Sequence, residues 1–305
     1  MSHTSRSANT QPQSAATRRG SASRQQPSGS DAGLALTPHD GIEDGDTQFV
    51  TAVARALSVL NAFRASDDGL GNAELAERTK LPKPTVSRLT YTLARCGYLD
   101  FNQRHRLYTL GVGVAALGNV ALAAMDVRKL ARPLMAELAR HSTFNVGLGT
   151  LDHHLMIYTD ACEGEALVGL RLYAGSRIPI LTSAMGRAYL AALPESERMA
   201  LMEELRPLYG AEWHSLQGAM MQSLRDLHTL GFCVSLGEWQ KDIHGAAAPI
   251  RSASGRIYAV NLGGPAHLLP EDRLRAELGP RVRDIARQIE VTMRPPTIPI
   301  SGRGS

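Results

Sequence analysis

The chain has 305 residues, of which 43% are hydrophobic and 20% are charged. These values are typical of a soluble globular protein, and the length is enough for two ordinary domains. The net charge of +4 favours a nucleic-acid partner but does not identify one. The three cysteines have no CxxC spacing, which argues against a disulfide framework and indicates reduced thiols in a cytoplasmic protein.

Both ends of the chain lack the hydrophobic periodicity of a folded segment. Residues 1–47 are dominated by Ser, Thr, Gln, Gly, Ala and Arg, a composition that predicts a disordered tail. The first residues also lack the apolar core of a secretory signal. Arginines in this tail allow non-specific contact with DNA phosphates, although a solvated tail is the simpler interpretation. Residues 295–305 contain proline and glycine and predict a second flexible tail.

The first predicted helix covers residues 49–63, where apolar side chains recur at helical spacing. Its inner face is expected to consist of Val53, Leu57, Leu60 and Phe63. Residues 67–69 then predict a turn, and Asn72 is a plausible N-cap for a second helix.

A third helix is predicted from residue 83 onward. Pro84 fits its first turn, where a missing N–H costs nothing, and Gly97 is placed to end it. Its inner face is expected to consist of Val86, Leu89, Leu93 and Ala94. Residues 98–110 alternate apolar and polar side chains and predict a two-stranded ribbon. This order of elements is that of a winged helix-turn-helix, which places one helix in the major groove of DNA.

Polar and basic side chains gather on the outer surface of this module. Between residues 83 and 106 there are five Lys or Arg residues and one acid, Asp100. Hydroxyl and guanidinium groups near a helix N-terminus suit phosphate oxygens and base edges. The predicted DNA-contacting residues are Arg55 on the first helix, Lys83, Thr85, Ser87, Arg88 and Tyr91 on the third, and Arg104 and Arg106 near the ribbon tip. A generic solvated surface is the alternative, but it does not explain why these features occur together.

Several strings along the chain resemble the IclR-type bacterial transcription regulators. They are RALSVLNAF (55–63), AELAERTKLPKPTVSRLTYTLARCGYL (73–99), YTLG (108–111), IPILTSAMGRAYLAAL (178–193), LGFCVSLGE (230–238) and HGAAAPIRSASGRIYAVNLGGP (244–265). The resemblance implies a winged helix-turn-helix domain at residues 48–111, a linker helix at 112–126 and a GAF-like effector-binding domain at 127–294. It also implies dimers, or dimers of dimers, that bind promoter DNA and respond to a small metabolite.

Residues 110–141 predict two helical stretches. The first is apolar on nearly all sides, yet it is shorter than the roughly 20 residues that a membrane span needs. A monomer would leave this surface exposed to water, so we predict that it is buried against a second copy in a symmetric dimer. Such a dimer would present two recognition helices to a roughly palindromic operator. A core helix within one chain is the alternative.

From residue 143 onward, short strand-like segments alternate with helices. Strands are predicted at residues 144–151, 155–162, 166–173, 232–236, 245–252 and 256–263. Helices are predicted at residues 183–193, 195–205, 221–230 and 270–293. This pattern predicts an antiparallel α+β domain in which helices flank the sheet.

A ligand pocket is predicted at the start of the helix over residues 183–193. Ser183 is expected to cap this helix, whose free backbone N–H groups would attract the carboxylate of a small organic acid. The resemblance extends the expected effector-binding set to Ser183, Ala184, Met185, Gly186, Ile243, Gly245, Asn261 and Gly263. Gly263 stands where some relatives carry a hydroxyl side chain. The Met185 side chain is expected to narrow the pocket beside the turn that begins the helix. The pocket is therefore expected to be apolar and to suit an aromatic or longer-chain acid.

Three other functions are alternatives to a ligand-responsive regulator. The histidines are scattered, with no HExxH motif, nucleophile elbow or acid–base pair, so we expect neither an enzyme nor a bound cofactor. His153 and His154 lie near Asp152, but neighbours on a strand point to opposite faces, which argues against a metal site. A DNA-binding dimer without effector control remains open, and a ligand-dependent change in operator binding would discriminate against it.

Overall fold

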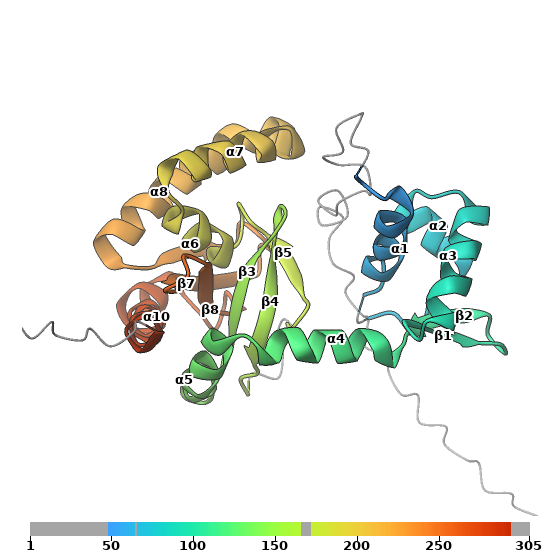
Figure 1. Cartoon of the computed structure of the whole chain (residues 1–305). Coiled ribbons are helices and arrows are strands. Elements are labelled where there is room, and N and C mark those ends of the chain that lie inside the picture. The colour runs from blue at the N-terminus through green and yellow to red at the C-terminus, as the bar shows by residue number, and fades with distance from the viewer. Residues whose placement is uncertain (1–47, 65, 166–171, 294–305) are drawn as a thin grey trace, which may run out of the picture.

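A computed structural model of the chain describes residues 48–64, 66–165 and 172–293. The tails expected at residues 1–47 and 295–305 lie outside the described residues, as does most of the strand expected at 166–173. The described chain forms a helical module with a hairpin, a helix that leads away from it, and a larger domain built around one sheet (Figure 1).

The N-terminal module is the winged helix-turn-helix that the sequence predicts. Three helices are followed by an antiparallel hairpin: α1 (Thr51–Asn61), α2 (Asn72–Thr79), α3 (Lys83–Arg95), β1 (Leu99–Asn102) and β2 (Leu107–Leu110). Pro84 lies in the first turn of α3, as expected. Gly97 ends the helix with a φ of 77°, and the N–H of Tyr98 donates to the Leu93 carbonyl over 2.9 Å.

The core of this module lies between the three helices and the hairpin. Its buried members are Val59, Leu70, Leu75, Ala76, Leu81, Val86, Leu93, Leu99 and Tyr108. The predicted inner face of α1 was partly wrong, because Val53 and Leu57 are 55% and 53% exposed while Val59 is fully buried. Leu60 and Phe63 pack on the core as expected. Apolar side chains occupy two sides of α1, and spacing alone does not reveal which side meets the other helices.

The predicted role of Asn72 as a helix cap was wrong. The N-cap of α2 is Gly71, and Asn72 is the first helical residue. Its Oδ1 instead accepts a hydrogen bond of 3.1 Å from the hydroxyl of Thr90, which is buried in α3. Asn72 therefore ties α2 to α3 rather than satisfying the start of its own helix.

The apolar helix α4 (Val112–Ala123) leads from the hairpin toward the second domain (Figure 1). It contains no buried residue, and Val112, Leu117 and Val120 are 80%, 58% and 71% exposed. The alternative of a core helix within one chain is therefore excluded. No helix among the described residues combines the length and the hydrophobicity that crossing a bilayer demands.

The second domain is built on a six-stranded sheet with the order β5-β4-β3-β8-β7-β6 and antiparallel pairing throughout. Its strands are β3 (Asn145–Asp152), β4 (Leu155–Cys162), β5 (Arg177–Pro179), β6 (Cys233–Leu236), β7 (Ile243–Arg251) and β8 (Ile257–Pro265). The α+β class expected from the sequence is confirmed. The short strand β5 was missed, because three residues are too few to show alternation.

Helices cover both faces of the sheet and divide its core in two. The helices α5 (Asp126–Ser142) and α10 (Gly279–Met293) pack on one face with Leu148, Val260 and other strand residues. The helices α6 (Ala184–Ala192) and α8 (Trp213–Leu230) pack on the other face with Met156 and Ala259, beside α7 (Glu195–Tyr209).

The C-terminal helix is interrupted where the sequence predicts one continuous helix. It consists of α9 (Glu271–Arg273), a π-helical turn over Leu274–Leu278 and α10. Pro280 is the second residue after the turn, and its missing N–H removes one of the regular helical hydrogen bonds. The wider π turn accommodates this break.

Candidate functional site

The outer surface of α3 presents the side chains that the sequence singled out for DNA. Lys83, Ser87, Arg88 and Tyr91 are exposed, and Thr85 is half-buried. Tyr91 is 65% exposed although it is aromatic. Neither Lys83 nor Arg88 forms an ion pair with any residue that the structure describes, so both positive charges remain available to a phosphate or a base edge.

The module holds α3 in place through its buried face. Thr90 is fully buried and donates to Asn72, as described above, while Val86 and Leu93 enter the core. The loop after α1 is fixed by Arg78, whose guanidinium donates to Asp67 over 2.6 and 3.0 Å and to the Ala62 carbonyl over 2.9 Å. This support makes α3 a rigid element, as a base-reading helix requires.

The tip of the hairpin carries Arg104, His105 and Arg106, all of them exposed. Asn102 shapes the tip, because its Oδ1 accepts from the backbone N–H groups of Arg104 and His105 at 3.0 and 3.2 Å. Two guanidinium groups therefore project at one end of a fixed turn. Such a tip suits contact with the DNA backbone or minor groove.

Arg55 differs from the other predicted contacts. It lies on α1 and is half-buried, and its Nε is enclosed without a hydrogen-bond partner among the described residues. Its contact with DNA stays a prediction.

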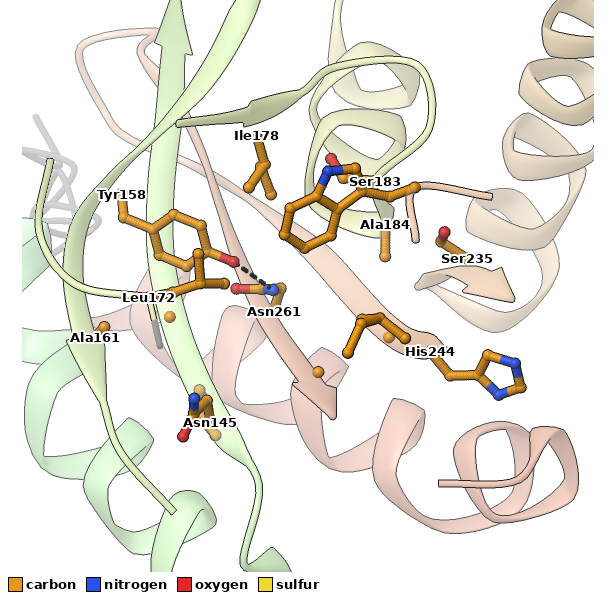
Figure 2. Close-up of a pocket in the computed structure, with 16 residues that line it drawn as sticks. Asn145, Tyr158, Ala161, Leu172, Ile178, Ser183, Ala184, Ser235, His244 and Asn261 are labelled. Carbon is orange, nitrogen blue, oxygen red and sulfur yellow. Dashed lines mark hydrogen bonds between the residues drawn. The ribbon is translucent and has the colours of Figure 1, made fainter. Parts of the chain in front are cut away.

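A cavity of about 40 Å³ lies between the sheet and the start of α6 (Figure 2). It is lined by Asn145, Val146, Gly147, Tyr158, Ala161, Leu172, Ile178, Ser183, Ala184, Ser235, Trp239, Ile243, His244, Gly245, Asn261 and Gly263. Six of the eight predicted effector residues are in this set: Ser183, Ala184, Ile243, Gly245, Asn261 and Gly263. Strands far apart in the sequence thus meet at the place that the sequence nominated.

The remaining two predicted residues, Met185 and Gly186, do not line the cavity. Met185 is fully buried, and a side chain at Gly149 would lie 2.5 Å from its sulfur. Gly186 packs so tightly on Ile180 that an added Cβ would lie 2.1 Å from the Ile180 carbonyl oxygen. Successive helical residues turn by about 100°, so the first residues of α6 cannot all face one cavity.

Ser183 caps α6 as predicted. Its hydroxyl accepts from the Gly186 N–H over 3.1 Å and donates to the Pro179 carbonyl over 2.6 Å. The N–H groups of Ala184 and Met185 also lie in the first turn, where the helix has no carbonyl to offer them. This end of α6 is therefore suited to a negatively charged or hydrogen-bond-accepting group.

Sequence reasoning missed the two large aromatic residues of the cavity, Tyr158 and Trp239. Tyr158 lies on β4 and its hydroxyl accepts a 2.9 Å hydrogen bond from Asn261 on β8 (Figure 2). Gly147 was the available signal, because a glycine inside a strand often marks the close approach of another group. Nothing in the local sequence marks Trp239, which lies between β6 and β7.

An ion pair between buried Arg187 and the more exposed Glu238 fixes the backbone of the segment that carries Trp239. Arg187 is 2% exposed and donates to Glu238 over 2.8 Å and to the Leu181 carbonyl over 2.9 Å. Burial raises the pKa of Glu238, but the charge and the hydrogen bond of Arg187 outweigh it and hold that pKa below its ordinary value. The Glu238 carboxylate is thus charged at neutral pH, and the positive charge of Arg187 neutralises it. Among the described lining residues there is no Lys or Arg.

The groups weighed for metal binding and nucleophilic chemistry are not assembled. No three His, Cys, Asp or Glu residues of the described chain lie together in a way that would hold a metal ion. His153 and His154 occupy the β3–β4 turn rather than a strand, so the premise used against them was wrong. Burial raises the pKa of the Cys233 thiol to about 12, which keeps it protonated and unreactive.

Comparison with known families settles what kind of protein carries these two sites. The model of the IclR helix-turn-helix domain matches residues 52–103, and that of the bacterial transcriptional regulator IclR C-terminal domain matches residues 119–291. The chain belongs to the IclR family of bacterial transcriptional regulators.

Individual relatives agree with this assignment over most of the chain. The HTH-type transcriptional regulator TsaQ1/TsaQ2 of Comamonas testosteroni is 30% identical over 258 residues, which are 84% of this chain and 92% of the relative. An IclR family regulator from Brucella abortus matches with 39% identity and a TM-score of 0.72, covering 85% of this chain and 98% of its own. An IclR homolog from Microbacterium hydrocarbonoxydans, complexed with 4-hydroxybenzoate, has the same fold with a TM-score of 0.64, 22% identity and coverage of 80% and 99%.

Membership in the IclR family establishes the general role of each site. The helix-turn-helix module binds DNA, and the C-terminal domain is a ligand-binding domain of a transcriptional regulator. The prediction that the protein is not an enzyme is confirmed, because the matched families and relatives are regulators.

Removing the Ser183 hydroxyl should destabilise the ligand-binding domain of this IclR regulator. The Ser183→Ala substitution leaves a buried N–H and a buried carbonyl without their partner, at a cost of about 1–3 kcal/mol. Ser223→Ala is the matched control, since its buried hydroxyl donates over 3.0 Å to the Ala219 carbonyl in the preceding turn and has no other partner in the described part of the chain. Urea unfolding of both variants measures the difference. Equal stability of the two would show that the cap contributes nothing.

Proposed function

We propose that this IclR-family chain is a dimeric regulator whose affinity for its operator changes when a small organic acid enters the cavity beside α6. The observation that carries the proposal is that one chain has both an exposed basic recognition surface and, in its second domain, a cavity at a helix N-terminus. The first site suits DNA, and the second suits a compact ligand with one acidic or polar end.

The DNA-contacting set is proposed to be Lys83, Thr85, Ser87, Arg88 and Tyr91 on α3, with Arg104 and Arg106 at the hairpin tip and Arg55 on α1. The exposure of the α3 and hairpin-tip side chains supports this assignment. Basic residues on both α3 and the hairpin also imply contact with phosphates at two places. Affinity for DNA should therefore depend strongly on salt.

An organic acid is favoured by the chemistry around the cavity. Its carboxylate would be held by the free N–H groups in the first turn of α6, and its apolar body by Ile178, Trp239 and Ile243. The complex of the Microbacterium hydrocarbonoxydans homolog with 4-hydroxybenzoate shows that this fold accepts an aromatic acid in at least one protein.

A symmetric dimer is favoured by the apolar surface that the described chain leaves uncovered. The exposed side chains of α4 have no partner helix in the single chain. Val53 and Leu57 on α1 add further exposed apolar surface near the DNA-binding module. Burial of such surfaces in a second copy would set the spacing of two α3 helices on the operator.

A pair of ion pairs joins the cavity wall to α5, the helix that follows α4. Asp160 on β4 is buried and lies between cavity residues Tyr158 and Ala161. Its carboxylate meets Arg128 over 3.2 Å and Arg132 over 2.5 Å, and both arginines belong to α5. Because α5 begins three residues after α4 ends, a shift of β4 on ligand binding would move the linker. This is the physical basis for coupling between the two sites.

The test is operator binding by fluorescence anisotropy, using the intergenic DNA next to the gene for this protein. We expect affinity to fall by about 10³-fold or more when salt rises from about 50 to 200 mM. In a panel of small organic acids, we expect one to change the dissociation constant by about 5- to 150-fold. If acids bind the protein but leave its DNA affinity unchanged, a DNA-binding dimer without effector control is the correct function.

A further inference from the structure

Tyr158 and Asn261 form an isolated polar pair in the otherwise apolar centre of the cavity (Figure 2). Both side chains are at least nine-tenths buried, with exposed fractions of 3% and 9%. Their only side-chain hydrogen bond among the described residues joins the Asn261 Nδ2 to the Tyr158 hydroxyl oxygen over 2.9 Å. They approach from β4 and β8, the two neighbours of β3.

Gly147 makes this pair possible. It lies on β3 opposite Asn261, between the two strands that carry the pair. A Cβ at this position would lie 2.2 Å from the Tyr158 ring and 3.0 Å from the Asn261 Oδ1. The missing side chain thus lets the phenol lie across β3 and reach Asn261, which places both polar groups at one point of the cavity.

The pair leaves a hydrogen on both donors and an acceptor unused. Asn261 Oδ1 is buried and has no hydrogen-bond partner among the described residues, and the Tyr158 hydroxyl accepts its bond and so keeps its own hydrogen. Burial raises the pKa of Tyr158 above its ordinary value, so the phenol stays protonated. Turning the amide by 180° keeps both kinds of group, because the hydroxyl then donates to the amide oxygen, the phenol oxygen can still accept, and the amide N–H groups are left over. In both orientations the cavity offers a donor beside an acceptor.

A ligand hydroxyl is the group that matches this arrangement, because it accepts one hydrogen bond and donates another. A carboxylate only accepts, so it would leave the acceptor of the pair unsatisfied; with the amide oriented as here, it would face the unpaired Asn261 oxygen in a part of the cavity without Lys or Arg. We propose that Tyr158 and Asn261 together select ligands that carry a hydroxyl group, so that the effector class is a hydroxylated aromatic acid. This inference rests on the proposed function, which supplies the carboxylate of the ligand. It deepens that proposal by naming a hydroxyl as the second polar group of the ligand.

The shape of the cavity favours a flat ring between the two polar ends. Gly245 and Gly263 lie opposite each other in neighbouring strands, and a side chain at Gly263 would meet only the His244 carbonyl, at 3.5 Å. The sheet therefore forms a flat floor. The cavity of about 40 Å³ is smaller than the roughly 150 Å³ that accommodates benzene, so a ring must displace a lining side chain. The side chain of Trp239 lies outside the strands and helices, so it can turn aside without disturbing the sheet while the Arg187–Glu238 pair holds its backbone.

The experiment compares benzoates that differ in one substituent. The probes are the 3- and 4-substituted hydroxy-, methoxy- and methylbenzoates, which share the carboxylate and the ring. Binding to the full chain without DNA is followed by tryptophan fluorescence and calorimetry. We expect one hydroxybenzoate to bind at least about tenfold more tightly than its methoxy and methyl analogues, because only the hydroxyl satisfies both partners.

Two variants test whether Tyr158 and Asn261 cause the preference for a ligand hydroxyl. Tyr158→Phe retains the ring and removes the hydroxyl, and Asn261→Leu removes the amide at similar volume. In both, we expect the preference for hydroxyl over methyl to fall to about twofold or less, while the methylbenzoate affinity stays within about threefold of the parent. Tyr189→Phe is the control, since it removes a hydroxyl from α6 at a residue that does not line the cavity. Thermal unfolding shows whether each variant is folded.

Every outcome decides the inference. Equal binding of hydroxy and methyl analogues, binding of none of them, or a preference that survives Tyr158→Phe in a folded protein would overturn it. The proposed function fails separately: a hydroxyl preference without any effect of the bound acid on operator affinity would remove effector control and leave the recognition pair intact.

Discussion

Replacing Arg88 with alanine is expected to abolish operator binding while leaving ligand binding intact. Arg88 lies on the exposed face of α3 and has no ion-pair partner among the described residues. A guanidinium that reaches a base edge contributes about 1–3 kcal/mol, and a two-fold dimer would lose the contact twice. The two losses correspond to a fall in affinity of about 30-fold to 10⁴-fold. Fluorescence anisotropy with the operator measures this fall, and calorimetry measures ligand affinity.

The control for Arg88→Ala removes the same charge from the other domain. Arg206 on α7 is 59% exposed and pairs only loosely with Glu203, over 3.7 Å. Arg206→Ala changes the net charge equally but leaves the DNA-binding module untouched, so its operator affinity should stay within about twofold of the parent. If Arg88→Ala binds DNA as tightly as Arg206→Ala, the assignment of α3 as the recognition helix is wrong.

Features with a local physical cause were predictable from the sequence. Gly97 ends α3 because only glycine readily adopts the positive φ of 77° found there, and Ser183 caps α6 through a bond to a residue three positions away. The order of helices and strands follows from hydrophobic spacing in the same way. Such signals lie within a few residues of one another, so they can be recognised without knowing the fold.

Features that depend on distant segments were not predictable. Packing against α3 determines which side of α1 is buried, so the sequence pattern assigned Val53 and Leu57 to the wrong side. Tyr158 and Asn261 meet across β3 although 103 positions separate them, and only the strand order brings them together. The resemblance to the IclR family supplied the β7 and β8 cavity residues, but family positions do not show how α6 rotates. Met185 was therefore placed in a cavity that it does not line.

Introducing a charge on α4 is expected to convert the proposed dimer to monomers. Val120 is 71% exposed, and α4 contributes no buried residue to the single chain. Val120→Glu should therefore leave the fold of each chain unchanged, while a charge in the proposed dimer contact would meet apolar surface without a partner. We expect dimer affinity to fall by at least about 10²-fold, since burying an unpaired charge costs several kcal/mol. Sedimentation equilibrium measures the association, and thermal unfolding of the monomer tests the fold.

Loss of the dimer should also remove operator binding, because each monomer then holds only one half-site and loses the advantage of joined contacts. Asn119→Glu is the matched control: it places the same charge on the neighbouring residue, which is polar and exposed. If α4 faces its partner through its apolar side chains, this variant remains dimeric and retains operator affinity. A parent protein that sediments as a monomer, or a Val120→Glu variant that stays dimeric at the parent's affinity, would show that the exposed surface of α4 does not mediate association. The recognition helices would then have to be paired by another part of the chain.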